Sequence, residues 1–433
     1  MKIGFFYRTY SKMSSRNIKA RLSITPLGYI TLAVCLISGL AGLNILTADL
    51  YKLFSLSFSL LLVSYLTRDK TGSSMKNISV SVFLGGRYNA GSSYKYSVRL
   101  HNGGSADISG IEIIPVTGKN IPSFEVFQSL SEPDERKRNI WDRNIYYFRW
   151  VWHMFRLHKV EFTPVVINGT LDAGAGAVFE GEFRAVKRGM AELKGVYLIR
   201  KHILGLFSSF RFIELQERFY IYPAPAPIDP ALADRIRLDI ARSASARSNI
   251  QKKFKAGDFV GIRDYVPGDP IKNIHWKTWA KRDRPAVIEK AVETVREISF
   301  LLINLNSGQT DNTSFEDCVS YLYSMTRKFE ADEYEISLYF FDSEGSVSFV
   351  HADLETGNFD MIYSSISQLD SYIIDKEKSI SKVKDYIEVS NTLVFSHEAD
   401  EITERFCRTY NLRLFSGKDI PKVNPENYQI NIP

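Results

Sequence analysis

The sequence predicts a multidomain chain with an N-terminal transmembrane helical hairpin, an all-β sandwich and a C-terminal α/β doubly wound domain. Three observations support this fold class: a long uncharged segment near the N-terminus, a following series of short alternating strands, and an alternation of strands and helices in the last third. The predicted domains are 1–70 for the basic tail and membrane helices, 71–223 for the sandwich, 224–297 for a linker and central motif, and 298–433 for the α/β domain.

Composition and charge exclude several classes of protein. The 433 residues, 45% of them hydrophobic, suffice for about two to four domains and exclude a disordered chain. Three cysteines without a CxxC pair exclude a disulfide framework and give no sign of a zinc site. Residues 1–290 hold 43 basic against 24 acidic residues, whereas residues 291–433 hold 12 against 25, which predicts a basic body and an acidic cap.

Two apolar segments predict the membrane hairpin. Residues 22–48 carry no charge and exceed the ~20 residues that a helix needs to cross a bilayer. Residues 53–67 offer only 15 uncharged positions, about 22 Å of helix against a ~30 Å hydrocarbon core, so Lys52 and Arg68 would extend to the two interfaces. We expect two spans with Asp49 near the tip of the hairpin; one span followed by an interfacial helix is the alternative.

Basic residues flank both segments on the side away from this tip. Because Lys and Arg are enriched in cytoplasmic loops, the distribution predicts a multi-pass protein of the cell membrane with both termini and the soluble domains in the cytoplasm. The flanking residues are Lys2, Arg8, Lys12, Arg16, Lys19, Arg21, Arg68, Lys70 and Lys76.

Residues 76–222 predict the all-β sandwich, of the immunoglobulin-like type. Segments such as 78–82 and 94–100 alternate between apolar and polar positions, and turn residues such as Asn102-Gly103-Gly104 separate them.

Residues 143–158 depart from the strand pattern because they are rich in aromatics and cations. A helical wheel places Arg149, His153 and Arg156 on one face and aromatic and aliphatic side chains on the other. Such a segment is either a basic amphipathic helix on an anionic leaflet or an insertion that packs its aromatics on the sandwich.

Residues 298–415 predict the α/β domain. The apolar run 298–305 is typical of a buried strand, and residues 314–329 form an amphipathic helical pattern. The alternation continues to a last strand at 412–415, which predicts a mostly parallel sheet flanked by helices. No glycine-rich phosphate-binding motif occurs, so we expect no nucleotide site.

The segment 257–289 holds the densest set of candidate functional residues. One interpretation is a structural and interaction motif, in which Arg–Asp pairs and a tryptophan lid fix a tight turn to the α/β domain. The alternative is a hydrolase-like enzyme, in which Asp258, Asp264 or Asp269 orients His275. The motif residues are Gly261, Arg263, Asp264, Tyr265, Pro267, Gly268, Asp269, His275, Trp276 and Lys277.

This motif resembles the hallmark of the bacterial "domain of unknown function 58" family in the pattern Gly261-Ile262-Arg263-Asp264-Tyr265-x-Pro267-Gly268-Asp269-x5-His275-Trp276-Lys277-x2-Ala280. Residues 187–193, 204–207 and 221–223 are similar to the family's Arg-Gly, Gly-Leu-Phe and Tyr-Pro segments. Lys201-His202-Ile203 stands where the family has Asp-Pro-Phe.

The resemblance implies a membrane-anchored protein with a β-sandwich and a von Willebrand factor A-like domain, partnered by a MoxR-type AAA+ ATPase and related membrane proteins. Domains of that type often carry a metal site after the first strand, with the signature Asp-x-Ser-x-Ser. The matching positions here, Asn304, Asn306 and Gly308, lack the carboxylate and hydroxyl ligands, so we expect no bound metal. Asp311 and Asp317 are the alternative ligands of a rebuilt site.

Together these patterns favour a membrane-anchored, non-enzymatic adaptor without a cofactor. Its expected partners are the lipid bilayer and, as the resemblance implies, a MoxR-type AAA+ ATPase and related membrane proteins. We expect no binding of nucleic acid, because no nucleic-acid-binding motif accompanies the basic stretch 252–290.

Overall fold

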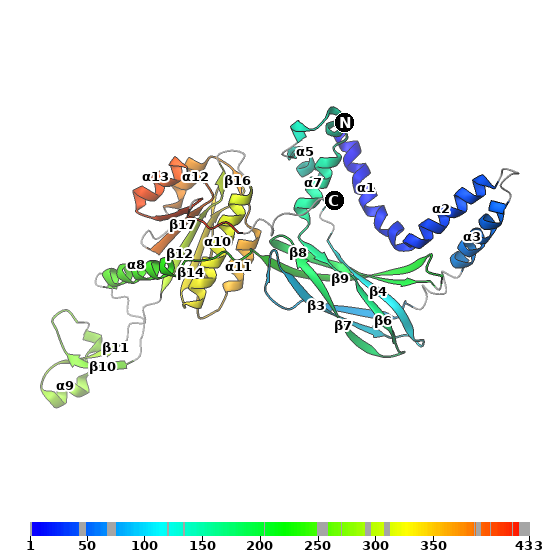
Figure 1. Cartoon of the computed structure of the whole chain (residues 1–433). Helices are drawn as coiled ribbons and strands as arrows, with labels where there is room; N and C mark the ends of the chain where they lie inside the picture. Colours follow the sequence, from blue (N-terminus) through cyan, green and yellow to red (C-terminus); the bar gives the residue numbers. More distant parts are fainter. Residues whose placement is uncertain are drawn as a thin grey trace. The chain divides into compact units, whose positions relative to one another are not determined.

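The computed structural model forms two compact units, Met1–Ala224 and Pro225–Val423 (Figure 1). Their boundary falls in the proline-rich segment 223–227, which is stiff and extended by composition. The structure describes residues 2–42, 49–66, 75–118, 121–132, 135–202, 204–248, 259–269, 271–290, 296–306, 312–384, 386, 391–398, 400–417 and 419–423.

Three helices begin the first unit: α1 Lys2–Ser23, α2 Pro26–Ala41 and α3 Asp49–Leu66. Thr25 caps α2, because its side-chain oxygen accepts a hydrogen bond from the Gly28 amide at 3.1 Å. Among the described residues, α3 is the one helix long and apolar enough to cross a membrane, and α2 is a shorter apolar helix. The two helices pack together, with the Phe54 ring lying against Gly39.

The lengths of α2 and α3 reverse the sequence expectation. The sequence predicts the longer span at 22–48, but α2 has 16 residues and α3 has 18. Because Thr25 is the N-cap, α2 begins only at Pro26 and excludes residues 22–25 of the predicted span. Residues 43–48 lie outside the described residues. α3 begins at Asp49, four residues before the predicted uncharged segment, and Asp49 pairs with Lys52 at 2.7 Å in its first turn.

Two curled sheets make up the body of the first unit, in the strand orders β1-β3-β7-β5 and β2-β9-β8-β4-β6. Period-two alternation brings the inward side chains of both sheets into one core, in which Tyr96 and Val98 of β3 meet Phe183 of β7 and Leu198 of β8. The strands are β1 Ile78–Phe83, β2 Tyr88–Asn89, β3 Ser93–Asn102, β4 Ile108–Thr117, β5 Val160–Phe162, β6 Val165–Leu171, β7 Gly176–Ala185, β8 Gly189–Lys201 and β9 Ser208–Tyr222.

A helical insertion separates β4 from β5 and packs on α1. Its aromatic core includes Tyr7 of α1, whose ring centroid lies 5.4 to 5.9 Å from those of Phe124, Phe127 and Trp150. The insertion contains α5 Phe124–Ser129, η2 Glu135–Lys137, α6 Ile140–Ile145 and α7 Tyr147–Leu157.

Helix α7 turns Arg149 and His153 of the predicted cationic face inward, whereas Arg156 is exposed. The Arg149 guanidinium forks onto the Glu135 carboxylate at 2.8 and 2.5 Å, and the buried His153 ring nitrogen Nε2 lies 3.1 Å from the Leu130 carbonyl oxygen. Burial lowers the pKa of His153, which keeps the ring neutral among aromatics. The helical wheel missed this arrangement because the neutralising carboxylate comes from η2. Tyr147 and Trp150 pack on rings of α1, and Trp150 also packs on Phe127 of α5. The segment is thus an insertion whose aromatics pack on these helices rather than on the sandwich alone, and its contact with a membrane leaflet stays a prediction.

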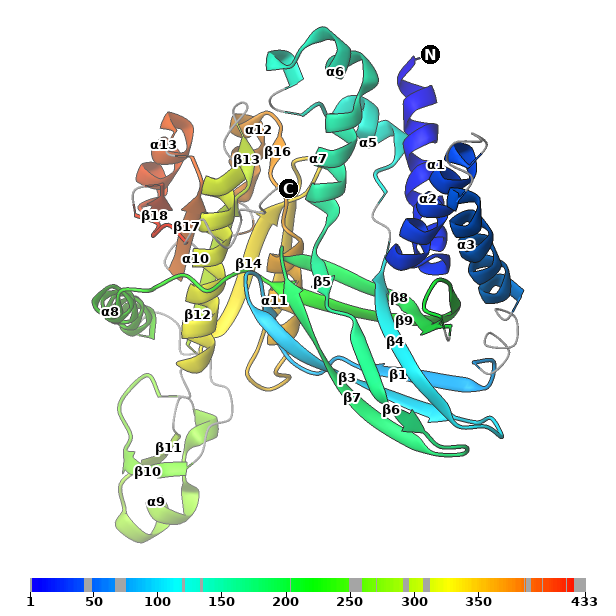
Figure 2. The same cartoon turned by 45° about the vertical axis from the view of Figure 1, so that its right-hand side comes forward.

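The second unit is built around a five-stranded sheet of order β15-β14-β12-β17-β18 (Figure 2). Four of its strands run parallel, and β15 pairs antiparallel with β14 at one edge. Helices cover both faces: Phe300 of β12 packs on Phe329 of α10, whereas Leu301 shares a cluster with Ile380 of α12 and Phe406 of α13. The predicted alternation of strands and helices is therefore present.

The elements of this unit, in chain order, are α8 Pro230–Ser248, β10 Phe259–Asp264, η3 Ile271–Asn273, α9 Trp276–Arg282, β11 Ala286–Lys290, β12 Glu297–Ile303, β13 Leu305–Asn306, α10 Asn312–Ala331, β14 Glu335–Phe341, β15 Val347–Ala352, α11 Phe359–Gln368, β16 Tyr372–Ile373, α12 Lys376–Val383, β17 Thr392–Ser396, α13 Glu401–Tyr410 and β18 Arg413–Ser416. β12 lies between β14 and β17, so the winding of the chain changes direction there. Ligands of open α/β sheets bind beyond the carboxyl ends of the strands at such a switch point.

Residues 259–290 form a small substructure that we call the signature lobe. The antiparallel pair β10–β11 is its base, with register from Phe259–Lys290 to Asp264–Ala286. α9 and η3 pack on β11. The segment that the sequence assigns to a linker and motif therefore has secondary structure of its own.

Candidate functional site

The turn of the signature lobe is closed by one charged pair. The Arg263 guanidinium donates two hydrogen bonds to the Asp269 carboxylate, at 2.8 and 2.7 Å, and the Val266 amide donates a third at 3.0 Å. Between them, Gly268 has a φ of 108°, which glycine adopts without strain. The paired fork is the strong form of this ion pair, so Arg263 and Asp269 hold the Pro267-Gly268 turn in shape.

The described contacts do not assemble the carboxylate–histidine pair of the hydrolase hypothesis. His275 Nδ1 lies 2.6 Å from the Thr278 hydroxyl, and its backbone amide donates to the Ala286 carbonyl at 2.9 Å. Asp269 contacts Arg263 instead, and Asp264 is exposed at the end of β10. Asp258 lies outside the described residues. Within the described part of the lobe, His275 therefore positions the start of α9.

Trp276 lies on the surface of the lobe. Its ring stacks on that of Trp279, with centroids 5.0 Å apart and planes inclined by 18°, and its side chain is 60% exposed. The expectation of a tryptophan lid over a buried network is therefore wrong. Val266 and Ile271 are also exposed in this lobe, and Lys277 is exposed beside Trp276 on α9.

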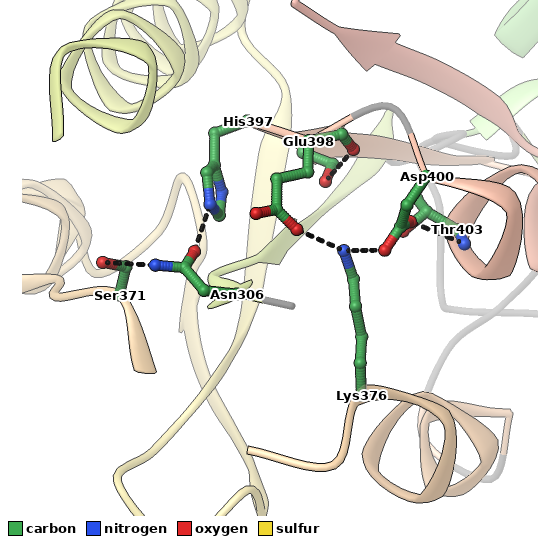
Figure 3. A network of polar contacts seen from close by, with 8 residues as sticks. Asn306, Ser371, Lys376, His397, Glu398, Asp400 and Thr403 are labelled. Atoms are coloured by element: carbon green, nitrogen blue, oxygen red, sulfur yellow. Dashed lines mark hydrogen bonds and ion pairs between the residues drawn. The ribbon is translucent and has the colours of Figure 1, made fainter. Parts of the chain in front are cut away.

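The carboxyl end of β12 carries the two asparagines of the degenerate metal motif. Asn304 is fully buried and joins three segments: its amide nitrogen donates to the carbonyl oxygens of Phe341 and Asp370, at 2.9 and 2.8 Å, and its oxygen accepts from the Phe341 amide at 2.9 Å. The Asn306 oxygen accepts from His397 Nε2, and the Asn306 nitrogen lies 3.4 Å from the Ser371 hydroxyl (Figure 3). The oxygens of both asparagines are thus engaged within the protein.

His397 comes directly after β17 and is buried. Burial is the main cause that lowers its pKa, and the positive charge of Lys376 adds to it against the carboxylates of Glu398 and Asp400. A neutral ring that donates from Nε2 to Asn306 has an unprotonated Nδ1. Among the described residues, this Nδ1 has no hydrogen-bond partner.

Lys376 is the buried cation of the same sheet edge. Its side chain is 3% exposed, and its ammonium lies 2.6 Å from an Asp400 carboxylate oxygen and 3.5 Å from one of Glu398. Asp400 also caps α13 by accepting from the Thr403 amide at 3.0 Å. Burial acts to raise the pKa of Asp400, but the hydrogen bonds from Lys376 and Thr403 outweigh it and lower the pKa.

We call the eight residues Asn304, Asn306, Ser371, Lys376, His397, Glu398, Asp400 and Thr403 the edge network. The sequence analysis missed its cation and its histidine. Polar residues that follow a predicted parallel strand, such as Ser396-His397-Glu398, were the available signal, because strand ends meet at one edge of a sheet.

The alternative metal ligands are not gathered at this edge. The Asp317 carboxylate accepts from the Val423 amide at 3.0 Å, and Gly308 and Asp311 lie outside the described residues. Within the part of the chain that the structure describes, no group of three or more His, Cys, Asp or Glu residues is placed to hold a metal ion. The carboxylates of Glu398 and Asp400 face the ammonium of Lys376 instead.

Comparisons with known proteins add no family. No protein-family model and no curated protein matches the chain. Among solved structures, it is similar to a PapD-like domain of human CEP192, with 10% identity, 35% of this chain and 87% of that chain covered, and a TM-score of 0.17. It is also similar to an exo-β-N-acetylglucosaminidase from Vibrio harveyi, with 7% identity, 74% and 56% covered, and a TM-score of 0.15. At these TM-scores neither likeness carries an argument.

Proposed function

We propose that this protein is a membrane-anchored adaptor of the "domain of unknown function 58" type, which docks a MoxR-type AAA+ ATPase through its signature lobe and catalyses no reaction itself. The observation that carries the proposal is the exposed ring of Trp276, stacked on the half-buried Trp279, on a lobe whose Arg263 and Asp269 pair with each other. The ATPase is proposed as the partner because the motif resembles that of the family. The motif residues lie in the signature lobe, so the lobe is the proposed docking site.

The composition of this surface suits protein recognition. Tryptophan is enriched among residues that dominate binding energy, and exposed apolar side chains that gather in one place mark interaction sites. Val266 and Ile271 add apolar surface, and Lys277, Lys281 and Arg282 give α9 a positive charge. The lobe is therefore suited to an acidic surface that has an apolar pocket for an indole ring.

The polar contacts of the lobe support a structural rather than a catalytic role for Asp269 and His275. Asp269 and His275 are each bound to another partner, Arg263 and Thr278, rather than to one another. A hydrolase mechanism would need a carboxylate that orients the histidine.

We further propose that α2 and α3 cross the membrane as a hairpin and that both soluble units lie in the cytoplasm. The first turn of α2 and the last turn of α3 contact the same turn of the sandwich. The Thr25 amide donates to the Leu206 carbonyl at 3.1 Å, and the Tyr65 and Phe207 ring centroids are 6.2 Å apart. Two packed helices that meet one point with opposite ends run antiparallel, and the basic flanks favour the cytoplasmic side for that end.

A site-specific crosslinking experiment tests the adaptor function. A photoreactive amino acid is placed at Trp276, and the matched control is placed at Phe349, an equally exposed aromatic on the edge strand β15 (62% against 60%). In native membranes, we expect the Trp276 probe to crosslink an AAA+ ATPase and the Phe349 probe to leave it unlabelled. Equal crosslinking from both positions, or none from Trp276, would contradict the proposal.

Thiol accessibility tests the topology. The exposed positions Val178, on β7, and Asp49, at the far end of α3, are each replaced by cysteine. In intact cells, a membrane-impermeant thiol reagent should label the Asp49→Cys protein and spare the Val178→Cys protein. Permeabilised cells should show labelling of both. Labelling of Val178→Cys in intact cells would place the first unit outside and overturn the two-span arrangement.

A further inference from the structure

The turn between β8 and β9 is tied to the start of α2. The Thr25 hydroxyl donates to the Gly205 carbonyl at 2.6 Å, and Ile24 forms an isolated β-bridge with Phe207. Gly205 has a φ of 63°, a left-handed conformation that glycine adopts without strain, and its carbonyl points at Thr25. Gly28 lies so close to the Leu206 carbonyl that any side chain would overlap it. These contacts account for the Leu204-Gly205-Leu206-Phe207 motif, which the adaptor function leaves unexplained.

The same turn lies at the start of α2 and the end of α3 and adds apolar residues there. α3, with 18 residues and about 27 Å, is long enough to cross a membrane, and α2, with 16 residues and about 24 Å, is shorter than the ~30 Å hydrocarbon core. Tyr29 near the start of α2 and Tyr65 near the end of α3 are exposed, as interfacial aromatics are. Leu204, in the turn that contacts both helix ends, is 40% exposed.

We propose that the β8–β9 turn is a lipid-contacting wedge, in which Leu204 enters the boundary between headgroups and acyl chains of the cytoplasmic leaflet. The inference rests on the proposed membrane hairpin. The apolar turn contacts the start of α2 and the end of α3, and it thereby extends the apolar surface of the helix pair. Lys201, 65% exposed at its side chain and 3.9 Å from Glu112, ends β8 and brings a positive charge to the anionic headgroups.

Depth-dependent fluorescence quenching tests the wedge. The purified full-length protein is reconstituted in vesicles of phosphatidylcholine and phosphatidylglycerol, with an environment-sensitive fluorophore on Leu204→Cys. The control is Met190→Cys, which is matched in exposure (38%) and lies at the other end of the same hairpin, roughly 35 Å away. A third label, Leu60→Cys in α3, reports the membrane span and has the same 40% exposure. Protein without an added cysteine gives the background of the three buried native thiols.

Lipids with a nitroxide near the headgroup should quench the Leu204 label several-fold more than the Met190 label. Lipids with a nitroxide deep in the acyl chain should quench the Leu60 label most. Equal quenching at Leu204 and Met190, while Leu60 is quenched, would overturn the wedge alone. Loss of quenching at Leu60 would instead refute the membrane hairpin of the proposed function. Fluorophore self-quenching at Leu204 that disappears on dilution with unlabelled protein would assign the turn to a second copy, and this too would overturn the wedge.

Discussion

The edge network and the signature lobe use reactive residue types in opposite ways. At the edge, Lys376, His397 and Asp400 are buried or half-buried and contact residues of other strands and helices. In the lobe, Arg263 pairs with Asp269, and Trp276 lies on the surface. The buried polar residues of the edge network thus contact one another within the sheet unit, whereas the lobe exposes the aromatic ring of Trp276. The following experiments test whether the edge network supports the stability of the protein and whether the signature lobe supports partner binding.

The largest effect should come from Lys376→Met. This substitution leaves the Glu398 and Asp400 carboxylates facing each other without their cation, which typically costs about 3–5 kcal/mol in free energy of unfolding. Denaturant titration of the full-length protein in detergent, followed by circular dichroism, measures the loss. The control is Lys378→Met, two residues along α12 and exposed, which should change little. Equal behaviour of the two variants would show that the edge network does not stabilise the sheet.

A smaller, pH-dependent effect should come from His397. Its pKa lies below the ordinary value of 6.5 in the folded protein, so the unfolded state binds the proton first as pH falls. Stability should therefore be complete above about pH 6.5 and fall below it, by at most ~1.4 kcal/mol per pH unit for one group. The His397→Gln protein should show a flatter dependence of thermal stability on pH between about pH 5 and 7, whereas His351→Gln, at an exposed position, should keep the wild-type slope. An unchanged slope in His397→Gln would refute the buried neutral histidine.

The smallest effect on stability should come from Trp276→Ala. Because this side chain is exposed, its removal should change the free energy of unfolding by no more than about 0.5 kcal/mol. Recovery of the ATPase with the full-length protein from solubilised membranes should nevertheless fall, and Phe349→Ala should leave it unchanged. A large loss of stability in Trp276→Ala would mean that the ring belongs to the core of the lobe, and the contrast between the two regions would disappear.

Local patterns predicted much of the fold. The apolar run 298–305 becomes the buried strands β12 and β13, and the amphipathic segment 314–329 lies within α10, because period and length depend on neighbouring residues only. The edge network was not predicted, since the contact of Asn306 with His397 joins residues 91 positions apart. The exposure of Trp276 was not predicted for a related reason. Whether the ring is buried depends on which residues pack over it, and the spacing of residues in the sequence does not show this.

The contact between Thr25 and the β8–β9 turn also constrains the order in which the protein is made. Its two partners are 180 residues apart, which at ~5–20 residues per second corresponds to roughly 10–40 s of synthesis. The first apolar helix therefore leaves the ribosome long before the turn that it must hold. In the proposed membrane hairpin, a substitution at Gly28 would leave insertion of α2 unimpaired but would prevent the contact between the finished sandwich and the start of α2. The expected phenotype is a protein that is inserted normally and degraded late.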